Sequence, residues 1–315
     1  MNWCKMPMNK IAAVVVTFNR KNLLKSCLKA INMQTFKPTS VYILDNASTD
    51  GTLDMVKSLG YYNQVVNGVE YKYVLNEKNE GGAGGFYKGM KYAFEDAQYD
   101  ALWVMDDDGE PASDCLELME PYLSQHDYVA PLAVSIEDRM TCAFKPNTSV
   151  EDFQQSAIND IVEDWASPFN GILYSAKLIK KIGFPKKEMF IWGDEVNYHW
   201  RAKNSQMPPI TVVKALHFHP KCKDVFVKTI GNRDIIFVPQ FWKGYCQYRN
   251  VMYNKWHVLP SKNIFSRLYD SLVYYYLHSY YFVKVKKDLR WQWCFTKAFF
   301  AGLFGVFGGQ WRYMK

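Results

Sequence analysis

Continuous apolar runs alternate with amphipathic segments along the first half of the chain. Residues 11–16 form a nearly unbroken apolar run, which is typical of a parallel strand covered on both faces. Residues 22–34 carry apolar side chains at a spacing that fits one face of a helix. The alternation continues with strands expected at 41–44, 71–75 and 102–105, and with helices at 52–59, at 115–123 and from the glycine run 81–85 to about 97. Strands that alternate with helices predict a doubly wound α/β sheet.

Polar clusters follow these predicted strands at the point where each strand ends. They are Thr17–Arg20, Asp45–Asn46, Asn79–Gly85 and Asp106–Asp108. Ligands of open α/β sheets bind at the carboxyl ends of the strands. The repeated coincidence therefore predicts a nucleotide site at this edge of the sheet.

Three consecutive carboxylates, Asp106, Asp107 and Asp108, follow the apolar run 102–105 directly. Burying a carboxylate without a partner is costly, and a divalent cation would offset that cost. In an extended segment Asp106 and Asp108 point to the same side, and two oxygen ligands there suit Mg²⁺ or Mn²⁺. The same residues are also good turn material. The neighbouring clusters favour the metal site.

The glycine run Gly81–Gly85 lacks the Gly-Lys-Ser/Thr of a Walker loop and does not match Gly-x-Gly-x-x-Gly. Glycines ahead of a helix allow the backbone to approach a phosphate closely. A flexible loop is the alternative interpretation of this run.

Residues 124–170 show a less regular pattern, and two further groups beyond them carry candidate chemistry. Asp194 and Glu195 either cap the helix that follows them or provide a general base. His217 and His219 lie on one side of a strand expected at 211–219. A lone histidine is usually structural, but two on one side make a metal ligand plausible.

Charge and aromatic content divide the chain unevenly. Residues 1–200 carry 19 Lys and Arg against 27 Asp and Glu, whereas residues 201–315 carry 19 against 4. Helices expected at 264–283 and 291–307 are aromatic, with lysines and an arginine between them. Such helices suit the lipid interface. Packing on the sheet domain is the alternative. We expect a catalytic domain over 1–240 and a membrane- or acceptor-associated helical region over 241–315.

The composition also limits the cellular setting. Seven scattered cysteines without a Cys-x-x-Cys pair indicate free thiols in a reducing compartment. Residues 1–9 lack the apolar core of a signal peptide, and no run of 18 uncharged apolar residues indicates a membrane-spanning helix. We therefore expect a cytoplasmic protein that is peripheral at the inner face of the cell membrane.

Four motifs occur in the order used by inverting glycosyltransferases of family 2, which the chain resembles over roughly residues 10–220. They are Val14–Arg20, Leu44–Thr52, Asn79–Phe86 and Asp106–Asp108. The resemblance implies the GT-A fold, in which a Rossmann-like, mostly parallel sheet is flanked by helices.

Further motifs narrow the resemblance to bacterial galactofuranosyl- and rhamnosyltransferases. They are Gly81–Phe86, Trp192–Glu195, Tyr248–Asn250 and Ala301–Gly305. The implied reaction moves a sugar onto a hydroxyl of a lipid-linked or glycan acceptor in bacterial cell-surface polysaccharide synthesis. The favoured donor is UDP-galactofuranose, and dTDP-rhamnose is the alternative.

The resemblance also implies a role for individual residues. Asp106, Asp108 and His217 would hold Mn²⁺ or Mg²⁺, with His219 as the other candidate ligand. Glu195 matches the general base, and Asp194 beside it is the alternative. Donor-binding positions would be Thr17, Asn19, Arg20, Asp45, Asn79, Gly81, Gly82, Asp106 and Asp107, and acceptor-binding positions Asn170, Trp192 and His219.

Two rival functions remain at this point. The basic, aromatic tail could bind nucleic acid by stacking on bases, although it contains no recognisable nucleic-acid module and we expect no nucleic-acid partner. A nucleotidyltransferase would also need acids and a metal at strand ends, but it would release pyrophosphate rather than a nucleoside diphosphate.

Overall fold

The computed structural model describes residues 9–221, 225–261 and 263–314, and contacts within the chain divide it into two compact units. Within the described residues, the first unit contains 9–81, 85–185 and 201–221. The second contains 82–84, 186–200 and the C-terminal residues from 225 onward. The expected division into 1–240 and 241–315 stays a prediction.

The first unit is built on a twelve-stranded mixed sheet with a parallel centre. Its neighbouring strands β4 (Val69–Leu75), β2 (Ser40–Asp45), β1 (Ile11–Thr17) and β5 (Ala101–Asp106) run parallel. Antiparallel β11 (Asn170–Ser175) separates β5 from the parallel pair β7 (Tyr128–Ser135) and β12 (Ile210–His219). The remaining strands are β3 (Gln64–Val66), β6 (Glu110–Pro111), β8 (Thr141–Cys142), β9 (Lys145–Ser149) and β10 (Ile161–Glu163).

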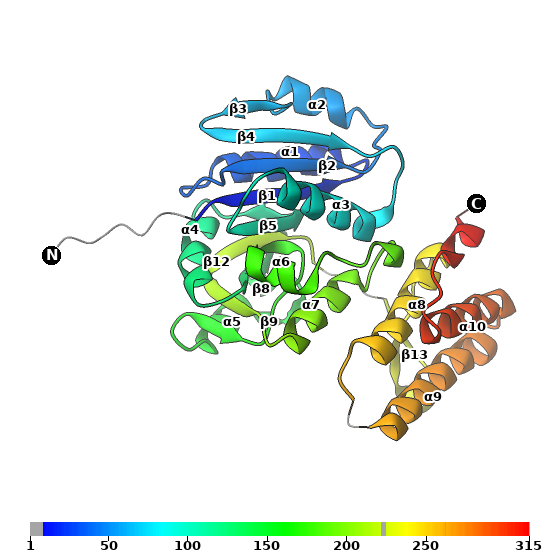
Figure 1. Ribbon diagram of the computed structural model, residues 1–315. Coiled ribbons are helices and arrows are strands. Elements are labelled where there is room, and N and C mark those ends of the chain that lie inside the picture. The colour runs from blue at the N-terminus through cyan, green and yellow to red at the C-terminus, as the bar shows by residue number, and fades with distance from the viewer. Residues whose placement is uncertain (1–8, 222–224, 262, 315) are drawn as a thin grey trace. The chain divides into compact units, whose positions relative to one another are not determined.

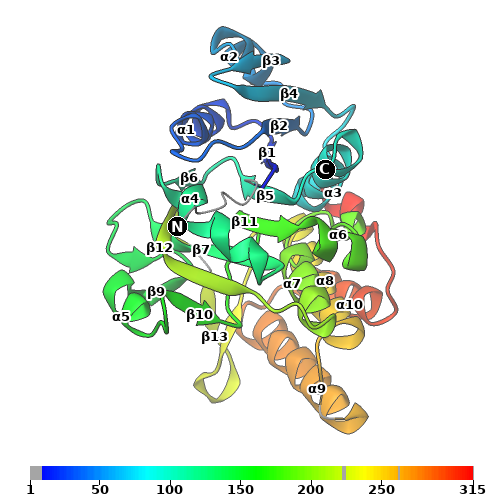
Figure 2. The same ribbon diagram turned by 60° about the vertical axis from the view of Figure 1, so that its left-hand side comes forward.

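The apolar strands are buried because helices cover both faces of the parallel centre, as Figures 1 and 2 show for α1 and α3. Ala13 and Val15 of β1 belong to the same core cluster as Leu24 and Leu28 of α1 (Lys21–Asn32). The alternate residues of β1 face α3 (Gly81–Asp96). Further helices of this unit are α2 (Thr52–Ser58), α4 (Cys115–Met119), α5 (Val150–Gln155), α6 (Ala176–Ile182) and the 3₁₀ turn η1 (Glu120–Ser124).

Glycines bring α3 close to the sheet. A Cβ atom at Gly85 would lie 2.5 Å from Val16 Cγ1, and one at Gly89 would lie 2.8 Å from Val14 Cγ1. Helix α3 begins at Gly81, so the glycine run forms its first turns rather than a separate loop ahead of it. Part of the run's purpose is therefore close packing of helix on strand.

Strand β7 lies in the region where the sequence indicated no regular element. All eight of its residues are buried, and Pro131 stands in the middle of the strand. Proline cannot donate a ladder hydrogen bond, so its presence argues against an interior strand. The register with β12 shifts between Val212 and Leu216, directly after Pro131 pairs with Val212. This irregularity accommodates the missing donor.

The second unit is mostly helical, and three long helices form its main part (Figure 1). They are α8 (Phe241–His257), α9 (Ile264–Tyr280) and α10 (Leu289–Leu303). A π-helical turn, η4 (Tyr281–Val285), continues α9, and two short strands, β13 (Phe226–Lys228) and β14 (Asp234–Ile236), form a hairpin. Other parts are η2 (Lys187–Met189), η3 (Ile230–Asn232), η5 (Gly309–Tyr313) and the start of α7 (Asp194–Asn204).

Aromatic side chains fill the core between these helices. Phe282, Trp291 and Phe295 are almost completely buried, and Trp291 stacks on Phe241 at 4.1 Å between ring centroids. Gly302 of α10 allows close approach to α8, because a Cβ there would lie 2.2 Å from the carbonyl oxygen of Arg249.

Two sequence expectations concern individual side chains and membrane spans. The described cysteines Cys27, Cys115, Cys142, Cys246 and Cys294 are buried free thiols. None of the helices formed by the described residues has both the length and the apolar character needed to cross a bilayer.

Histidine 278 generates a prediction about acid stability. Burial lowers its pKa to about 4, although the carbonyl of Tyr274, 2.9 Å from Nδ1, opposes the shift. The unfolded chain therefore binds more protons than the folded chain below about pH 6.5, and stability falls as pH decreases from there. Relative to His278→Phe, the wild type should lose about 2 kcal/mol of unfolding free energy between pH 7.5 and 5.0 in urea titrations. His126→Gln, at a half-buried position, is the control, and an equal pH dependence in wild type and His278→Phe would contradict the expectation.

Candidate active site

A buried carboxylate, Asp107, joins the ends of β1 and β5. Its Oδ2 accepts a hydrogen bond from Thr17 Oγ1 at 2.7 Å, and its Oδ1 lies 3.2 Å from Arg20 Nη1. Burial raises the pKa of Asp107 to about 6, against the opposing effects of Thr17 and Arg20. The side chain is thus held by both of its oxygens at the carboxyl edge of the sheet.

Asp108 lies beside it, between a cation and an imidazole. Its Oδ2 is 2.9 Å from Arg20 Nη1, and its Oδ1 is 3.2 Å from His219 Nε2. Burial would raise the pKa of Asp108, but the contact with His219 and the charge of Arg20 outweigh it and hold the pKa below its usual value. Nδ1 of His219 lies 2.6 Å from the carbonyl oxygen of Pro220.

The two carboxylates that contact Arg20 are those of Asp107 and Asp108. The expectation of an extended segment with Asp106 and Asp108 on the same side was wrong, because β5 ends at Asp106 and the next two residues form a turn. Asp106 is half-buried, and its backbone N–H donates to the carbonyl of Phe169 at 3.2 Å.

The end of β2 is linked to the loop after β1. Asp45 is buried, accepts the Ser48 backbone N–H at 2.8 Å, and also accepts the hydroxyl of Tyr73. Burial, followed by this contact with Asp45, raises the pKa of Tyr73. Asn19, with a φ of 52°, donates its backbone N–H to Ser48 Oγ and accepts from Thr49 N at 2.7 Å. These side chains form a polar rim at the strand ends.

Asn46 connects this rim to the glycine run. Its Nδ2 donates to Asn79 Oδ1 at 3.1 Å and to the Gly81 carbonyl at 2.9 Å. Its Oδ1 accepts from Asn76 Nδ2 and from the Glu80 backbone N–H. One buried amide therefore fixes the segment that leads into α3.

His217 is completely buried between two glycines. A Cβ at Gly109 would lie 2.1 Å from its Nε2, and a Cβ at Gly171 would lie 2.7 Å from its Nδ1. Burial foremost lowers the pKa of His217 to about 3, so the ring is neutral at physiological pH. Neither ring nitrogen has a hydrogen-bond partner among the described residues.

The imidazole and carboxylate groups at this edge of the sheet are ligand types that bind divalent cations. A neutral imidazole with unsatisfied nitrogens is a good ligand, and a histidine that ligates a metal usually engages a carbonyl with its other nitrogen, as His219 does. Over residues 9–221, 225–261 and 263–314, however, no three acidic, histidine or cysteine side chains are gathered as a metal site. Arg20 lies beside Asp108 where a cation would compete with it.

The acid pair belongs to the second unit, at the start of α7. Asp194 is buried, whereas Glu195 is half-buried and its Oε1 accepts the Gly193 backbone N–H at 2.9 Å. Acids in the first turn complement the helix dipole, so the capping role is present. The role as general base stays a prediction.

The two predicted acceptor positions outside the histidine strand have different environments. Asn170, on β11, is buried, and its Oδ1 has no hydrogen-bond partner in the described structure. Trp192, in the second unit, is 37% exposed, and Lys243 Nζ lies 5.6 Å from its ring centroid.

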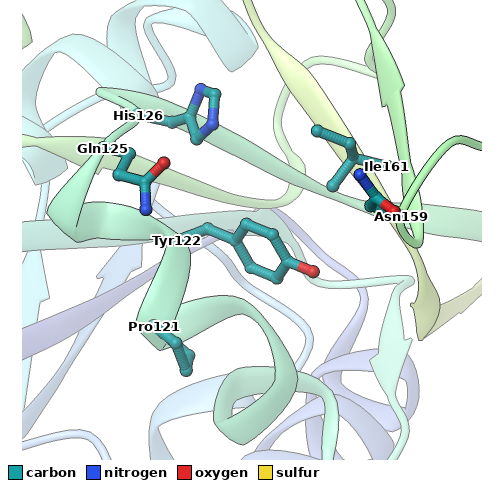
Figure 3. Close-up of a pocket in the computed structure, with 6 residues that line it drawn as sticks. All are labelled: Pro121, Tyr122, Gln125, His126, Asn159 and Ile161. Carbon is teal, nitrogen blue, oxygen red and sulfur yellow. The ribbon is translucent and has the colours of Figure 1, made fainter.

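A hollow of about 360 Å³ lies elsewhere on the first unit. Figure 3 shows Tyr122 and His126 on one side and Asn159 and Ile161 on the other. Tyr122 and His126 precede β7, which runs parallel to β12 and begins at Tyr128. The hollow is therefore at the amino ends of these strands, away from the polar rim, and carries none of the predicted site residues.

The polar rim contains residues that sequence reasoning did not assign. The sequence placed Asn46 in the polar cluster after the second predicted strand, but no binding or catalytic role was assigned to it. Tyr73 carried no signal, because its position within a strand does not reveal that its hydroxyl reaches Asp45. Gly82, Trp192, Asp194 and Glu195 belong to the second unit, so the described contacts leave their assigned roles as predictions.

Comparison with known families and proteins agrees with this architecture. The family model described as "Glycosyl transferase family 2" matches residues 12–172. The galactofuranosyltransferase GlfT1 of Mycolicibacterium smegmatis is 30% identical over 236 residues, which cover 71% of this chain and 75% of that protein. GlfT1 of Mycobacterium tuberculosis is 28% identical over 298 residues, covering 90% and 92%.

Solved structures share the fold at low sequence identity. S. aureus TarS 1–349 in complex with UDP-GlcNAc has a TM-score of 0.57 at 16% identity, covering 93% of this chain and 81% of that one. GalNAc-T7 with UDP, GalNAc and Mn²⁺ has a TM-score of 0.52 at 16% identity, covering 69% and 44%. The expected GT-A fold is confirmed.

Thr17 provides a test of the Asp107 contacts. Thr17→Val keeps the shape of the side chain but removes the hydroxyl, leaving a buried carboxylate with one donor fewer. We expect a loss of about 1–3 kcal/mol in unfolding free energy at pH 7.5, measured by urea titration. Thr17→Ser retains the hydroxyl and should lose clearly less; equal losses in the two variants would contradict the expectation.

Proposed function

Because the chain belongs to glycosyl transferase family 2 and is a glycosyltransferase, we propose that it transfers galactofuranose from UDP-galactofuranose. The acceptor is a hydroxyl of a lipid-linked or glycan molecule in bacterial cell-surface polysaccharide synthesis. The observation that carries the choice of sugar is the 28–30% identity to proteins named galactofuranosyltransferase over 71–90% of the chain. The alternative donor, dTDP-rhamnose, is an outcome of the test below.

The donor nucleotide occupies the polar rim of the first unit in this proposal. Thr17, Asn19, Arg20 and Asp45 contribute to the base and ribose site, and the segment Asn79–Gly82 approaches the diphosphate. The support is the contact network that holds these side chains at adjacent strand ends. Arg20 is a half-exposed guanidinium beside two carboxylates, and a bound diphosphate would give it a third anionic partner.

A divalent cation, Mn²⁺ or Mg²⁺, is the proposed cofactor, with Asp106 and Asp108 and one of His217 and His219 as ligands. The contact geometry favours His219. Its Nδ1 donates to the Pro220 carbonyl, so Nε2 is the ring nitrogen that faces the Asp108 carboxylate, at 3.2 Å. A proton or a divalent cation between Nε2 and the carboxylate oxygen makes this contact favourable. The bound ion would neutralise charge on the leaving diphosphate.

The proton transfer is assigned to the acid pair. The carboxylate of Glu195 or Asp194 takes the proton of the acceptor hydroxyl. That oxygen forms the new bond to the anomeric carbon while the bond from this carbon to the diphosphate oxygen breaks, and the nucleoside diphosphate leaves with the electron pair. A single displacement from the opposite face inverts the anomeric centre. The buried Asp194 and the capping Glu195 differ enough in environment to be tested separately.

Peripheral contact with the cytoplasmic face of the membrane is proposed for the second unit. On α9, Phe265, Tyr269, Leu272 and Tyr276 are exposed at a spacing that places them on one helix face. Helix α10 exposes Leu289, Trp293 and Phe300, and Phe304 directly after it is also exposed. Exposed basic residues lie where α9 passes into α10, namely Lys284 in η4, Lys287 after it and Arg290 in the first turn of α10. Aromatic faces next to basic residues suit an anionic lipid surface.

The reaction is tested by donor turnover of the purified protein. We expect UDP release with UDP-galactofuranose and a lipid-linked acceptor, and loss of more than 90% of it in EDTA, restored by Mn²⁺. Glu195→Gln with Asp194→Asn should lower kcat at least 100-fold, since general bases contribute about 10²–10⁴. Unchanged turnover in EDTA would refute the metal role, full activity of the double variant would refute the base, and preferred use of dTDP-rhamnose would change the donor.

Membrane contact is tested by flotation with vesicles. The protein should float with vesicles containing phosphatidylglycerol and less well at high salt, because screening weakens the basic contribution. Leu272→Glu with Tyr276→Glu should reduce flotation at least fivefold. Val65→Glu changes an equally exposed apolar residue of β3 and serves as the control. Retardation of an oligonucleotide without vesicle binding would support the nucleic-acid alternative.

A further inference from the structure

Helix α8 carries a row of buried polar side chains within an otherwise aromatic unit. Arg249, Asn250 and Asn254 are 0%, 0% and 2% exposed. A polar group in such a place is costly unless its hydrogen bonds are satisfied. Five of the nine described side-chain hydrogen bonds of these three residues end on a single segment, Met189–Gly193, just ahead of the acid pair.

The segment Met189–Gly193 has an unusual backbone. Phe190 has a φ of 68°, Trp192 of 58° and Gly193 of 84°. Left-handed conformations at residues other than glycine cost of the order of 1–3 kcal/mol each and persist only where the surroundings impose them. No helix or strand ladder runs through residues 190–192, so their carbonyls depend on other donors, whereas the Gly193 carbonyl already accepts the backbone N–H of Asn197 at 2.9 Å.

The α8 side chains supply donors to the carbonyls of Met189, Ile191 and Trp192, whereas the Phe190 carbonyl accepts the Ala83 backbone N–H at 3.1 Å. Asn250 Nδ2 donates to the carbonyls of Met189 at 3.0 Å, Ile191 at 3.1 Å and Trp192 at 2.6 Å. Arg249 Nη2 donates to the Met189 carbonyl at 2.7 Å, and its Nε donates to Asn250 Oδ1 at 2.9 Å. The guanidinium thereby orients the Asn250 amide so that its nitrogen faces the backbone.

Asn254 extends the row to the first turn of α7. Its Nδ2 donates to the Gly193 carbonyl at 2.7 Å, and its Oδ1 accepts from Asn197 Nδ2 at 2.9 Å. Gly193 is also packed tightly, because a Cβ there would lie 2.9 Å from Asn250 Cβ. Asn254 therefore contacts the chain on both sides of Asp194 and Glu195, at Gly193 before α7 and at Asn197 within it.

We infer that Asn250 and Asn254, oriented by Arg249, are positioning residues that set the direction of the carboxylates of Asp194 and Glu195. The inference rests on the proposed function, because the acid pair is the base only in that proposal. A purely structural row would stabilise any segment. This row instead ends on the strained residues that lead directly into the pair.

The test combines a local structural readout with kinetics. Asn254→Leu removes the donor to Gly193 at similar volume, and Asn254→Asp removes the same donor while keeping the acceptor for Asn197. Ser271→Ala is the control, since it removes the buried hydroxyl that accepts the Trp256 Nε1–H at 3.0 Å in the same unit, without contacting this segment. Hydrogen exchange of peptides covering 189–197 and steady-state kinetics are measured for all three.

We expect exchange at 189–197 to rise at least fivefold in both Asn254 variants and to be unchanged in Ser271→Ala. We also expect kcat to fall at least tenfold in the Asn254 variants while KM for the donor stays within twofold, because the described side-chain hydrogen bonds of Asn254 reach none of the donor residues. If Asn254→Leu does not fold, Asn254→Asp carries the same comparison.

Two results would overturn the inference. One is exchange at 189–197 that rises no more than in the control. The other is faster exchange with kcat equal to that of the control, while Glu195→Gln with Asp194→Asn is inactive. Full activity of that double variant would instead overturn the assignment of the base, so the two failures are distinguishable.

Discussion

The first unit depends on how it keeps negative charge at the end of a buried strand. Asp107 and Asp108 follow a fully apolar segment of β5, where two uncompensated carboxylates would be too costly to bury. One guanidinium, one hydroxyl and one imidazole, from Arg20, Thr17 and His219, provide the compensation. These partners come from the ends of β1 and β12, so the chemistry of one turn ties together strands far apart in sequence. A ligand that binds at these carboxylates would compete with Arg20 for them.

The second unit differs from the first, because uncharged apolar packing dominates it and a few polar side chains are buried within an aromatic core. Burial lowers the pKa of Arg249, whose described donors reach amide and carbonyl oxygens rather than a carboxylate. A hydrophobic side chain at this position would pack at lower desolvation cost. The buried polar side chains of α8 instead donate hydrogen bonds to residues 189–193, whose irregular backbone forms no helix or strand ladder to satisfy these carbonyls. Aromatic packing provides the stability of this unit, and the polar row provides the shape of one segment.

Much of the fold was predictable because it rests on local periodicity. The strands ending at Thr17, Asp45 and Asp106 and the helices between them follow from apolar patterns, and the clustering of polar residues at their ends follows from parallel topology. Strand β7 was not predictable, since Pro131 contradicts the strand rule and only the shifted register with β12 permits it. The contacts between side chains could not be predicted either. The alternation of a strand placed Asp106 and Asp108 on the same side, but β5 ends at Asp106. Likewise, the motif Tyr248–Asn250 could be noticed in the sequence, whereas its contacts to residues 189–193 depend on tertiary packing.

Pro131 has a consequence for how the chain folds. Pairing β7 with β12 joins residues about eighty positions apart, and contacts of such high sequence separation form slowly. During that search a slip by one residue would exchange the side chains on the two buried faces of β7. A slip toward Thr211 would also place Pro131 opposite a regularly paired part of β12, where a buried carbonyl would lack its donor. A residue that weakens the native ladder at one point thus penalises the competing alignments and narrows the set of misfolded intermediates.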